Sequence, residues 1–243
     1  MFNYPMKPEE NILENFSLTI ESGERLALVG LNGAGKSTLI KLLCRFYDPV
    51  KGAVLINGTD LREINLNDWY SNLALLAQHF DTYQFKAWEN IALGRLNGER
   101  NQQKIECSAR RAQADSFIER WKNRYDQQIG VEFDGGIDLS GGQRQKLALA
   151  RTLYRNAFVT ILDEPTAHVD ADSEQRIFEQ LNSELDKTQS LILISHRFST
   201  VRNADRICVI ENGRVAELGS HEALLAERGI YAHLFEQQAK GYR

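Results

Sequence analysis

A glycine-rich stretch near the N-terminus carries the clearest chemical signal in this chain of 243 residues. It has the spacing of a phosphate-binding P-loop, in which four residues separate a glycine from Gly-Lys-Ser. The glycines let the backbone N–H groups converge on phosphate oxygens, the lysine adds a positive charge, and the serine hydroxyl suits Mg²⁺. The candidate loop consists of Gly30, Leu31, Asn32, Gly33, Ala34, Gly35, Lys36, Ser37 and Thr38.

The residues on both sides of this loop support the prediction. The apolar run Leu26–Val29 before it is typical of a buried strand, and Thr38–Cys44 after it suits a helix. A glycine-rich turn without chemistry is the alternative, but it does not require this strand–loop–helix order.

Other polar residues follow apolar runs at the points where strands are expected to end. Parallel α/β sheets place their ligand sites at the carboxyl ends of their strands, so these side chains are candidates for the same site. The alternative for each is an ordinary polar residue at the start of a loop, or a structural histidine. They are Gln78 after Leu73–Ala77, Asp163 and Glu164 after Phe158–Leu162, and His196 after Leu191–Ile194.

The remaining elements follow from periodicity and turn residues. Phe16–Ile20 alternates like a strand and indicates an antiparallel start, and Asn-Gly pairs at 57–58 and 212–213 predict two hairpins. The polar stretch Gly94–Arg124 has apolar residues at helical spacing and predicts a helical insertion. Arg144–Tyr154 and the tail from His221 to Arg243 are also expected to be helical.

Composition narrows the class of protein. Hydrophobic residues make up 42% and charged residues 26% of the chain, as in ordinary globular proteins, and the net charge of −4 gives no basic footprint for nucleic acid. No nucleic-acid partner is therefore expected. The three cysteines stand far apart, which suggests neither a zinc site nor a disulfide framework. No apolar run approaches the length of a membrane span.

The segment Leu139-Ser-Gly-Gly-Gln143 gives these motifs a family. Followed by Arg-Gln-Lys and, about twenty residues later, by Asp163-Glu164, it resembles the signature of nucleotide-binding domains of ATP-binding cassette (ABC) proteins. The resemblance covers essentially the whole chain. It implies an α/β P-loop NTPase fold, a RecA-like parallel-sheet core with an N-terminal antiparallel β subdomain and an inserted helical subdomain. The expected boundaries within the single domain 1–243 are 1–80 for the β part and P-loop core, 81–138 for the helical part and 139–243 for the rest of the core.

The resemblance also implies roles for individual residues around ATP and Mg²⁺. Ser37, Gln78 and Asp163 match metal ligands, and Glu164 matches the glutamate that orients the attacking water. His196 resembles a histidine that contacts the γ-phosphate, and Lys36 and Gln78 complete the catalytic set. Tyr4 resembles the aromatic residue that stacks on adenine, although Phe2 could take this role, or the Tyr4 ring could belong to the core.

The signature implies a dimer. In the family, residues equivalent to Ser140, Gly141, Gly142 and Gln143 bind ATP held by the opposing subunit, so each site combines two nucleotide-binding domains, in a homodimer or a heterodimer. The following Ala167-His168-Val-Asp170 keeps the family's aspartate but departs from its usual Ser-Ala-Leu-Asp.

Three segments resemble the exporter branch of the family: Glu89–Ile91, Gly219–Leu225 and Gly229–Tyr231. This branch implies a transmembrane domain whose coupling helices contact the aromatic region Phe80–Trp88, and a place on the cytoplasmic face of a membrane. Those aromatic side chains could instead be packed inside the helical insertion. Phe2-Asn-Tyr-Pro5 resembles the middle of the branch's first strand, so we expect the cytosolic part of a longer half-transporter, with a separate subunit as the alternative.

Two other functions stay open at this stage. One is a soluble ABC ATPase acting on ribosomes or DNA, although such proteins usually carry two cassettes or a long coiled-coil insertion. The other is a regulatory subunit that closes on ATP without cleaving it. The transported substrate would be selected by membrane helices and is not encoded in this stretch.

Overall fold

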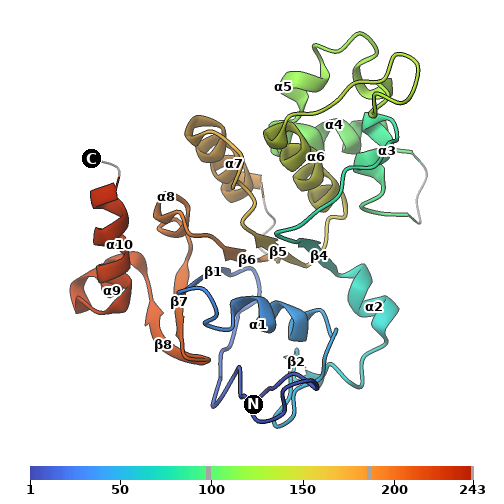
Figure 1. Cartoon of the computed structure of the whole chain (residues 1–243). Coiled ribbons are helices and arrows are strands. Elements are labelled where there is room, and N and C mark those ends of the chain that lie inside the picture. Colours follow the sequence, from blue (N-terminus) through green and yellow to red (C-terminus); the bar gives the residue numbers. More distant parts are fainter. Residues whose placement is uncertain (97–99, 185–187, 242–243) are drawn as a thin grey trace. The chain divides into compact units, whose positions relative to one another are not determined.

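The computed structural model describes residues 1–96, 100–184 and 188–241 (Figure 1). The chain divides into two compact units, the first formed by Met1–Leu73 with Lys187–Arg243 and the second by Ala74–Asp186. Residues 97–99 of the predicted helical insertion and residues 242–243 of the predicted helical tail lie outside the described residues.

The first unit contains the strand that leads into the P-loop. Its strands lie in the order β6-β1-β7-β8. β1 is parallel to β6 on one side and to β7 on the other, and β8 returns antiparallel to β7. The turn between β7 and β8 uses Asn212 and Gly213, both with positive φ, so the predicted hairpin is confirmed. The bounds are β1 Arg25–Val29, β6 Ser190–Ile194, β7 Arg206–Glu211 and β8 Arg214–Gly219.

Helices cover this sheet and complete the first unit. A buried cluster joins side chains of β1 and β7 to those of the C-terminal helices, with Phe198, Leu224 and Tyr231 among its members. These aromatic and aliphatic side chains explain why the amphipathic tail folds against the sheet. The helices are α1 Lys36–Leu43, α2 Leu66–Ser71, α8 Phe198–Val201, α9 His221–Glu227 and α10 Ile230–Gly241.

The antiparallel start is smaller than predicted. The hairpin predicted at residues 57–58 forms between β2 (Leu55–Ile56) and β3 (Thr59–Asp60). Phe2 makes an isolated antiparallel bridge to Leu13. The prediction of a strand at Phe16–Ile20 is wrong. Its side chains do alternate between half-buried and exposed, but within the described residues no strand pairs with its backbone, so alternation here reflects one-sided burial alone.

The second unit holds the helical insertion, which is confirmed. Helix α6 lies at its centre, in contact with α3 and α4, and the four helices α3 to α6 form one cluster in Figure 1. Seven residues of α6 are buried, and the predicted helix at Arg144–Tyr154 is confirmed. The elements are β4 Leu73–Leu76, α3 Ala87–Ala92, α4 Gln102–Arg111, α5 Asp115–Ile118, η1 Arg124–Asp126, α6 Gly141–Tyr154, β5 Val159–Asp163 and α7 Ala171–Glu184, with β4 beside β5.

Across the described stretches, each helix is too short or too polar to cross a bilayer.

A buried carboxylate should matter for the stability of the first unit. Glu24, only 8% exposed, accepts two hydrogen bonds from Arg206, at 2.6 and 2.9 Å, and one from the backbone N–H of Glu21. We expect Glu24→Ala to lower the free energy of unfolding by about 2 kcal/mol, because the guanidinium and the N–H both lose a charged acceptor. Urea denaturation measures this.

The exposed ion pair between Arg214 and Glu14 provides the control, since its 2.6 Å contact lies in solvent. Arg214→Ala should cost less than about 0.5 kcal/mol. Equal losses for the two variants would show that burial of Glu24 has no special role.

Candidate nucleotide-binding site

Two glycines of the loop are required by their surroundings. Gly30 has φ 155° and Gly35 has φ 111°, both in the region that favours glycine. A Cβ on Gly30 would lie 2.3 Å from the carbonyl oxygen of Ile210, and one on Gly35 would lie 2.7 Å from the side chain of Leu13. The loop can therefore approach β7 and the N-terminal segment only without side chains at these positions.

The loop presents polar groups around a lysine. The Lys36 ammonium is buried and donates to the carbonyl oxygens of Gly30 at 2.6 Å and Leu31 at 3.0 Å. Helix α1 starts at this lysine, and its N-cap Gly35 provides no side-chain cap, so backbone N–H groups there are suited to an anion. Leu31, Asn32, Gly33 and Ser37 are exposed, whereas Ala34, Gly35 and Thr38 are buried.

The parallel register brings His196 to the same sheet edge as the loop. Leu28 of β1 pairs with Ile194 of β6, and the chain leaves both strands within two residues, toward Gly30 and His196. His196 is exposed, and its carbonyl oxygen accepts a hydrogen bond from Gln238 of α10 at 2.5 Å. This placement is the one predicted for parallel strands.

Tyr4 lies against α1. Its hydroxyl is 3.0 Å from the Thr38 hydroxyl, and Lys41 donates to it at 3.3 Å with the ammonium 5.1 Å from the ring centre. Phe2 and Tyr47 contact the ring edge-on. Because Phe2 is only 2% exposed and Tyr4 is half-buried, Tyr4 is the ring with surface left for a ligand.

In the second unit, the residues after β4 and β5 come together. The Gln78 amide nitrogen lies 3.4 Å from a Glu164 carboxylate oxygen, and Asp163 ends β5 directly before it. Glu164 has φ 52°, a left-handed conformation that costs a non-glycine residue free energy. Two of the predicted water- and metal-binding side chains therefore lie within reach of each other, one of them on a strained backbone.

The signature forms the N-terminus of α6. The Ser140 hydroxyl accepts from the backbone N–H of Gln143, whose side chain accepts from the N–H of Ser140. This reciprocal capping box fixes the start of the helix. Ser140 and Gly141 are exposed, and Gly142 and Gln143 are half-buried, while Leu139 anchors the segment in the core.

Sequence reasoning did not single out Gln145, which connects two of these segments. Its side chain is 1% exposed, donates to the Glu164 carbonyl oxygen at 2.8 Å and accepts from the His168 N–H at 2.7 Å. Gly142 comes so close to His168 that a Cβ would lie 2.8 Å from its carbonyl oxygen. Gln145 lies inside the Arg-Gln-Lys that follows the signature, and this position was the sequence signal that could have identified it.

A second network holds the aromatic segment after Gln78 onto α6. The buried Asn90 side chain bonds both the N–H and the carbonyl oxygen of Tyr83. Arg151 donates to the backbone carbonyls of Asn90 and Asp81, and its guanidinium lies 4.7 Å from the Tyr83 ring centre. Burial lowers the pKa of Arg151, as expected for a cation removed from water.

The aromatic residues themselves are not packed inside the helical insertion as a group. Tyr83 and Phe85 are 43% and 47% exposed and stack with their ring centres 6.0 Å apart. Phe80 and Trp88 are half-buried, with the Arg100 guanidinium over Trp88. A pair of exposed stacked rings on a tightly bonded backbone is a surface suited to a partner.

With this geometry in place, comparison with known proteins defines the class. A family model described as ABC transporter matches residues 13–167, more than half of the chain. The chain therefore belongs to the ABC transporter family. It has the P-loop NTPase fold that the sequence predicted and is an ATP-binding ATPase domain of that family.

Individual relatives place it near exporters. It is 41% identical to the multidrug resistance protein pgp-1 of Caenorhabditis elegans over 98% of this chain and 18% of that protein. It is 40% identical to ABC transporter B family member 28 of Arabidopsis thaliana, covering 33% of it. A solved structure of a bacterial Atm1-family ABC exporter with ATP bound matches with a TM-score of 0.87 and 36% identity, over 95% of this chain and 39% of that one. The chain thus spans a fifth to two fifths of the length of these proteins.

The buried Gln145 amide gives a prediction about stability. Gln145→Leu should lower the free energy of unfolding by about 2 kcal/mol, because the Glu164 carbonyl and the His168 N–H each lose a buried partner. Thr152→Val, in the same helix, removes one hydroxyl bonded to the Ala148 carbonyl and should cost less than about 1 kcal/mol. Urea unfolding of both variants tests this, and a smaller loss for Gln145→Leu than for Thr152→Val would contradict it.

Proposed function

We propose that this chain is the nucleotide-binding domain, spanning 1–243, of an exporter that uses ATP hydrolysis to move a substrate across a membrane. The observation that carries the proposal is the presence, in one chain, of a P-loop built on glycines that tolerate no side chain and of a serine-capped signature helix. The subdivision of the domain at 1–80, 81–138 and 139–243 is part of this proposal.

The proposed nucleotide contacts follow from chemistry. The N–H groups of Gly30–Thr38 and the Lys36 ammonium bind the β- and γ-phosphates, and the Tyr4 ring stacks on adenine. The hydroxyl of Ser37, the carboxylate of Asp163 and the amide oxygen of Gln78 are oxygen donors of the kind that Mg²⁺ prefers, so the residues fit this ion. When bound, the ion neutralises charge that develops on the phosphate oxygens.

Hydrolysis is proposed to depend on positioning of a water molecule. The Glu164 carboxylate accepts a hydrogen bond from that water and orients its oxygen toward the γ-phosphorus. Gln78, whose amide nitrogen lies 3.4 Å from Glu164, holds the water from another side. His196, exposed at the carboxyl edge of β6, is proposed to donate to a γ-phosphate oxygen.

A second nucleotide-binding domain completes each site in this proposal. Ser140, Gly141, Gly142 and Gln143 contact the γ-phosphate of ATP bound to the opposing domain, so ATP favours the closed dimer by binding it more tightly than the open one. A homodimer and a heterodimer both satisfy this arrangement. Gln145 would couple ATP cleavage to the interface between the two domains, because its side chain bonds both the Glu164 backbone and the His168 backbone.

The membrane partner is proposed to dock on the stacked pair Tyr83 and Phe85. A coupling helix of a transmembrane domain would pack against these rings on the cytoplasmic face, and Arg151 would link them to the signature helix. The names of the relatives favour transport over the soluble ABC ATPase considered from sequence.

The first test addresses catalysis. Glu164→Gln should lower the rate of phosphate release at least about 100-fold while ATP binding is kept, because orientation of the water is lost and the phosphate contacts are not. Phosphate release and ATP titration measure the two effects. Glu179→Gln, on the exposed side of α7, is the matched control and should hydrolyse normally. Equal rates for Glu164→Gln and the unaltered chain would favour a regulatory subunit that only binds ATP.

The second test addresses the dimer. Ser140→Arg should leave ATP binding to the monomer intact but prevent ATP-driven dimerisation of a Glu164→Gln background, because a long cation replaces the serine at the proposed interface. Size-exclusion chromatography with ATP measures this. Ser116→Arg, at an exposed position of α5, should still dimerise. A dimer that persists in Ser140→Arg would place the interface elsewhere.

A further inference from the structure

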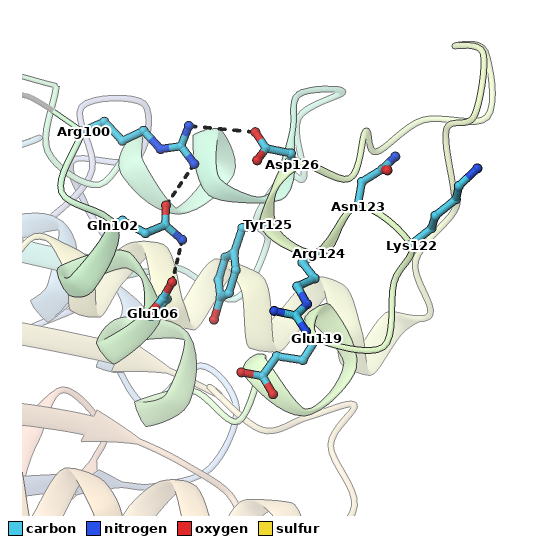
Figure 2. Close-up of a pocket in the computed structure, with 9 residues that line it drawn as sticks. All are labelled: Arg100, Gln102, Glu106, Glu119, Lys122, Asn123, Arg124, Tyr125 and Asp126. Atoms are coloured by element: carbon cyan, nitrogen blue, oxygen red, sulfur yellow. Dashed lines mark hydrogen bonds and ion pairs between the residues drawn. The ribbon is translucent and has the colours of Figure 1, made fainter.

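A cavity of about 640 Å³ opens in the second unit (Figure 2). It is formed by α4, the end of α5 and η1, and Gln78, Asp163, Glu164 and the signature do not line it. Its volume is in the range of small-molecule sites. Its lining is unusually polar, since three acids and three bases face it.

On one side of the cavity, the polar side chains already form hydrogen bonds and an ion pair with one another. Arg100 lies 3.9 Å from Asp126 and donates to Gln102 at 2.9 Å, and Gln102 donates to Glu106 at 2.8 Å. Figure 2 shows these four side chains as a continuous chain of contacts. This side is therefore ordered before any ligand arrives.

The other side carries charges without such partners. Glu119, Lys122 and Arg124 are exposed, and in the described part of the chain no ion pair involves their side chains. The cavity thus presents a free carboxylate and two free cations within one small volume.

Tyr125 is the buried polar group between these sides. It is only 7% exposed and lines the cavity, and within the described residues its hydroxyl is not among the buried polar atoms that lack a partner. Figure 2 shows its ring in the middle of the lining, with the hydroxyl directed between Glu106 and Glu119. A ligand in the cavity can pair with this hydroxyl, because a phenol both donates and accepts hydrogen bonds.

The electrostatics around this hydroxyl are negative. Burial raises the pKa of Tyr125 above its usual range, and the charges of Asp115, Glu106 and Glu119 raise it further. A positively charged group is favoured beside the hydroxyl, whereas Lys122 and Arg124 favour a negative group farther along the lining. Among the described residues no group of acidic, histidine and cysteine side chains is arranged to hold a metal ion.

We propose that this cavity is a binding site for a small zwitterion, a molecule the size of an amino acid or dipeptide that carries both an ammonium and a carboxylate. The ammonium lies against Glu119 and the Tyr125 hydroxyl, which accepts a hydrogen bond from it. The carboxylate lies against Lys122 and Arg124. Neither a simple anion nor a simple cation matches both halves of this lining.

Arg124, which lines the cavity, has a strained backbone. Arg124 has φ 47°, a conformation in which glycine would be more stable. An arginine there carries a conformational cost, and its guanidinium faces the cavity. Arg124→Gly is therefore a suitable test variant, because it removes the cation and also relieves the backbone strain.

The test uses the full chain, isotope-labelled for NMR, titrated with alanyl-alanine. We expect a dissociation constant on the order of 1 mM, with shifts concentrated at residues 119–126 and in α4. The N-acetylated dipeptide and the dipeptide amide, which each lack one charge, should bind at least about fivefold more weakly. Arg124→Gly and Tyr125→Phe should weaken the dipeptide by a similar factor while their melting temperatures stay the same or rise.

Arg95→Ala is the control, because Arg95 is exposed and does not line the cavity, and this variant should bind the dipeptide like the unaltered chain. Absence of localised shifts with all three probes would overturn the proposal. Equal binding of the dipeptide and its amide would overturn the zwitterion in favour of a simple cation, and unchanged affinity in Tyr125→Phe would remove the hydroxyl from the site.

Discussion

The parallel pairing of β1 with its neighbours is the constraint on which the candidate site in the first unit depends. Because β1 lies between β6 and β7, its carboxyl end meets the edge where His196 also leaves the sheet. The chain must then turn within van der Waals reach of the Ile210 carbonyl, which only a glycine at position 30 permits. The register of β1, the glycine at position 30 and the start of α1 therefore depend on one another.

In the second unit, α6 performs the corresponding task. Its N-terminus is the capped signature, its second turn holds the Glu164 backbone through Gln145, and its last turns hold the aromatic segment through Arg151. A rigid helix with buried polar bonds at both ends can transmit displacement along its length. The proposed dimer contact and the proposed membrane contact thus lie on opposite ends of one element.

The sequence predicted much of this and missed identifiable parts. The P-loop, the strands ending at Gln78, Asp163 and His196, and the helical insertion follow from spacing and periodicity, which are local properties. Asn90 could not be found that way, and Gln145 only through its place directly after the signature, because the roles of both depend on partners 7 and 19 residues away that the fold brings together. The strand at Phe16–Ile20 was predicted wrongly because alternation reports burial of one face and not the presence of a neighbouring strand.

The left-handed backbone at Glu164 has an evolutionary consequence. Selection for thermal robustness alone would replace this residue by glycine or asparagine, which adopt φ 52° at lower cost. With glutamate at this position, the chain loses some folding free energy and holds a carboxylate at the end of β5. Given the role proposed for Glu164, homologues that do not hydrolyse ATP would be free of that conflict, and glycine or asparagine at this position would distinguish them.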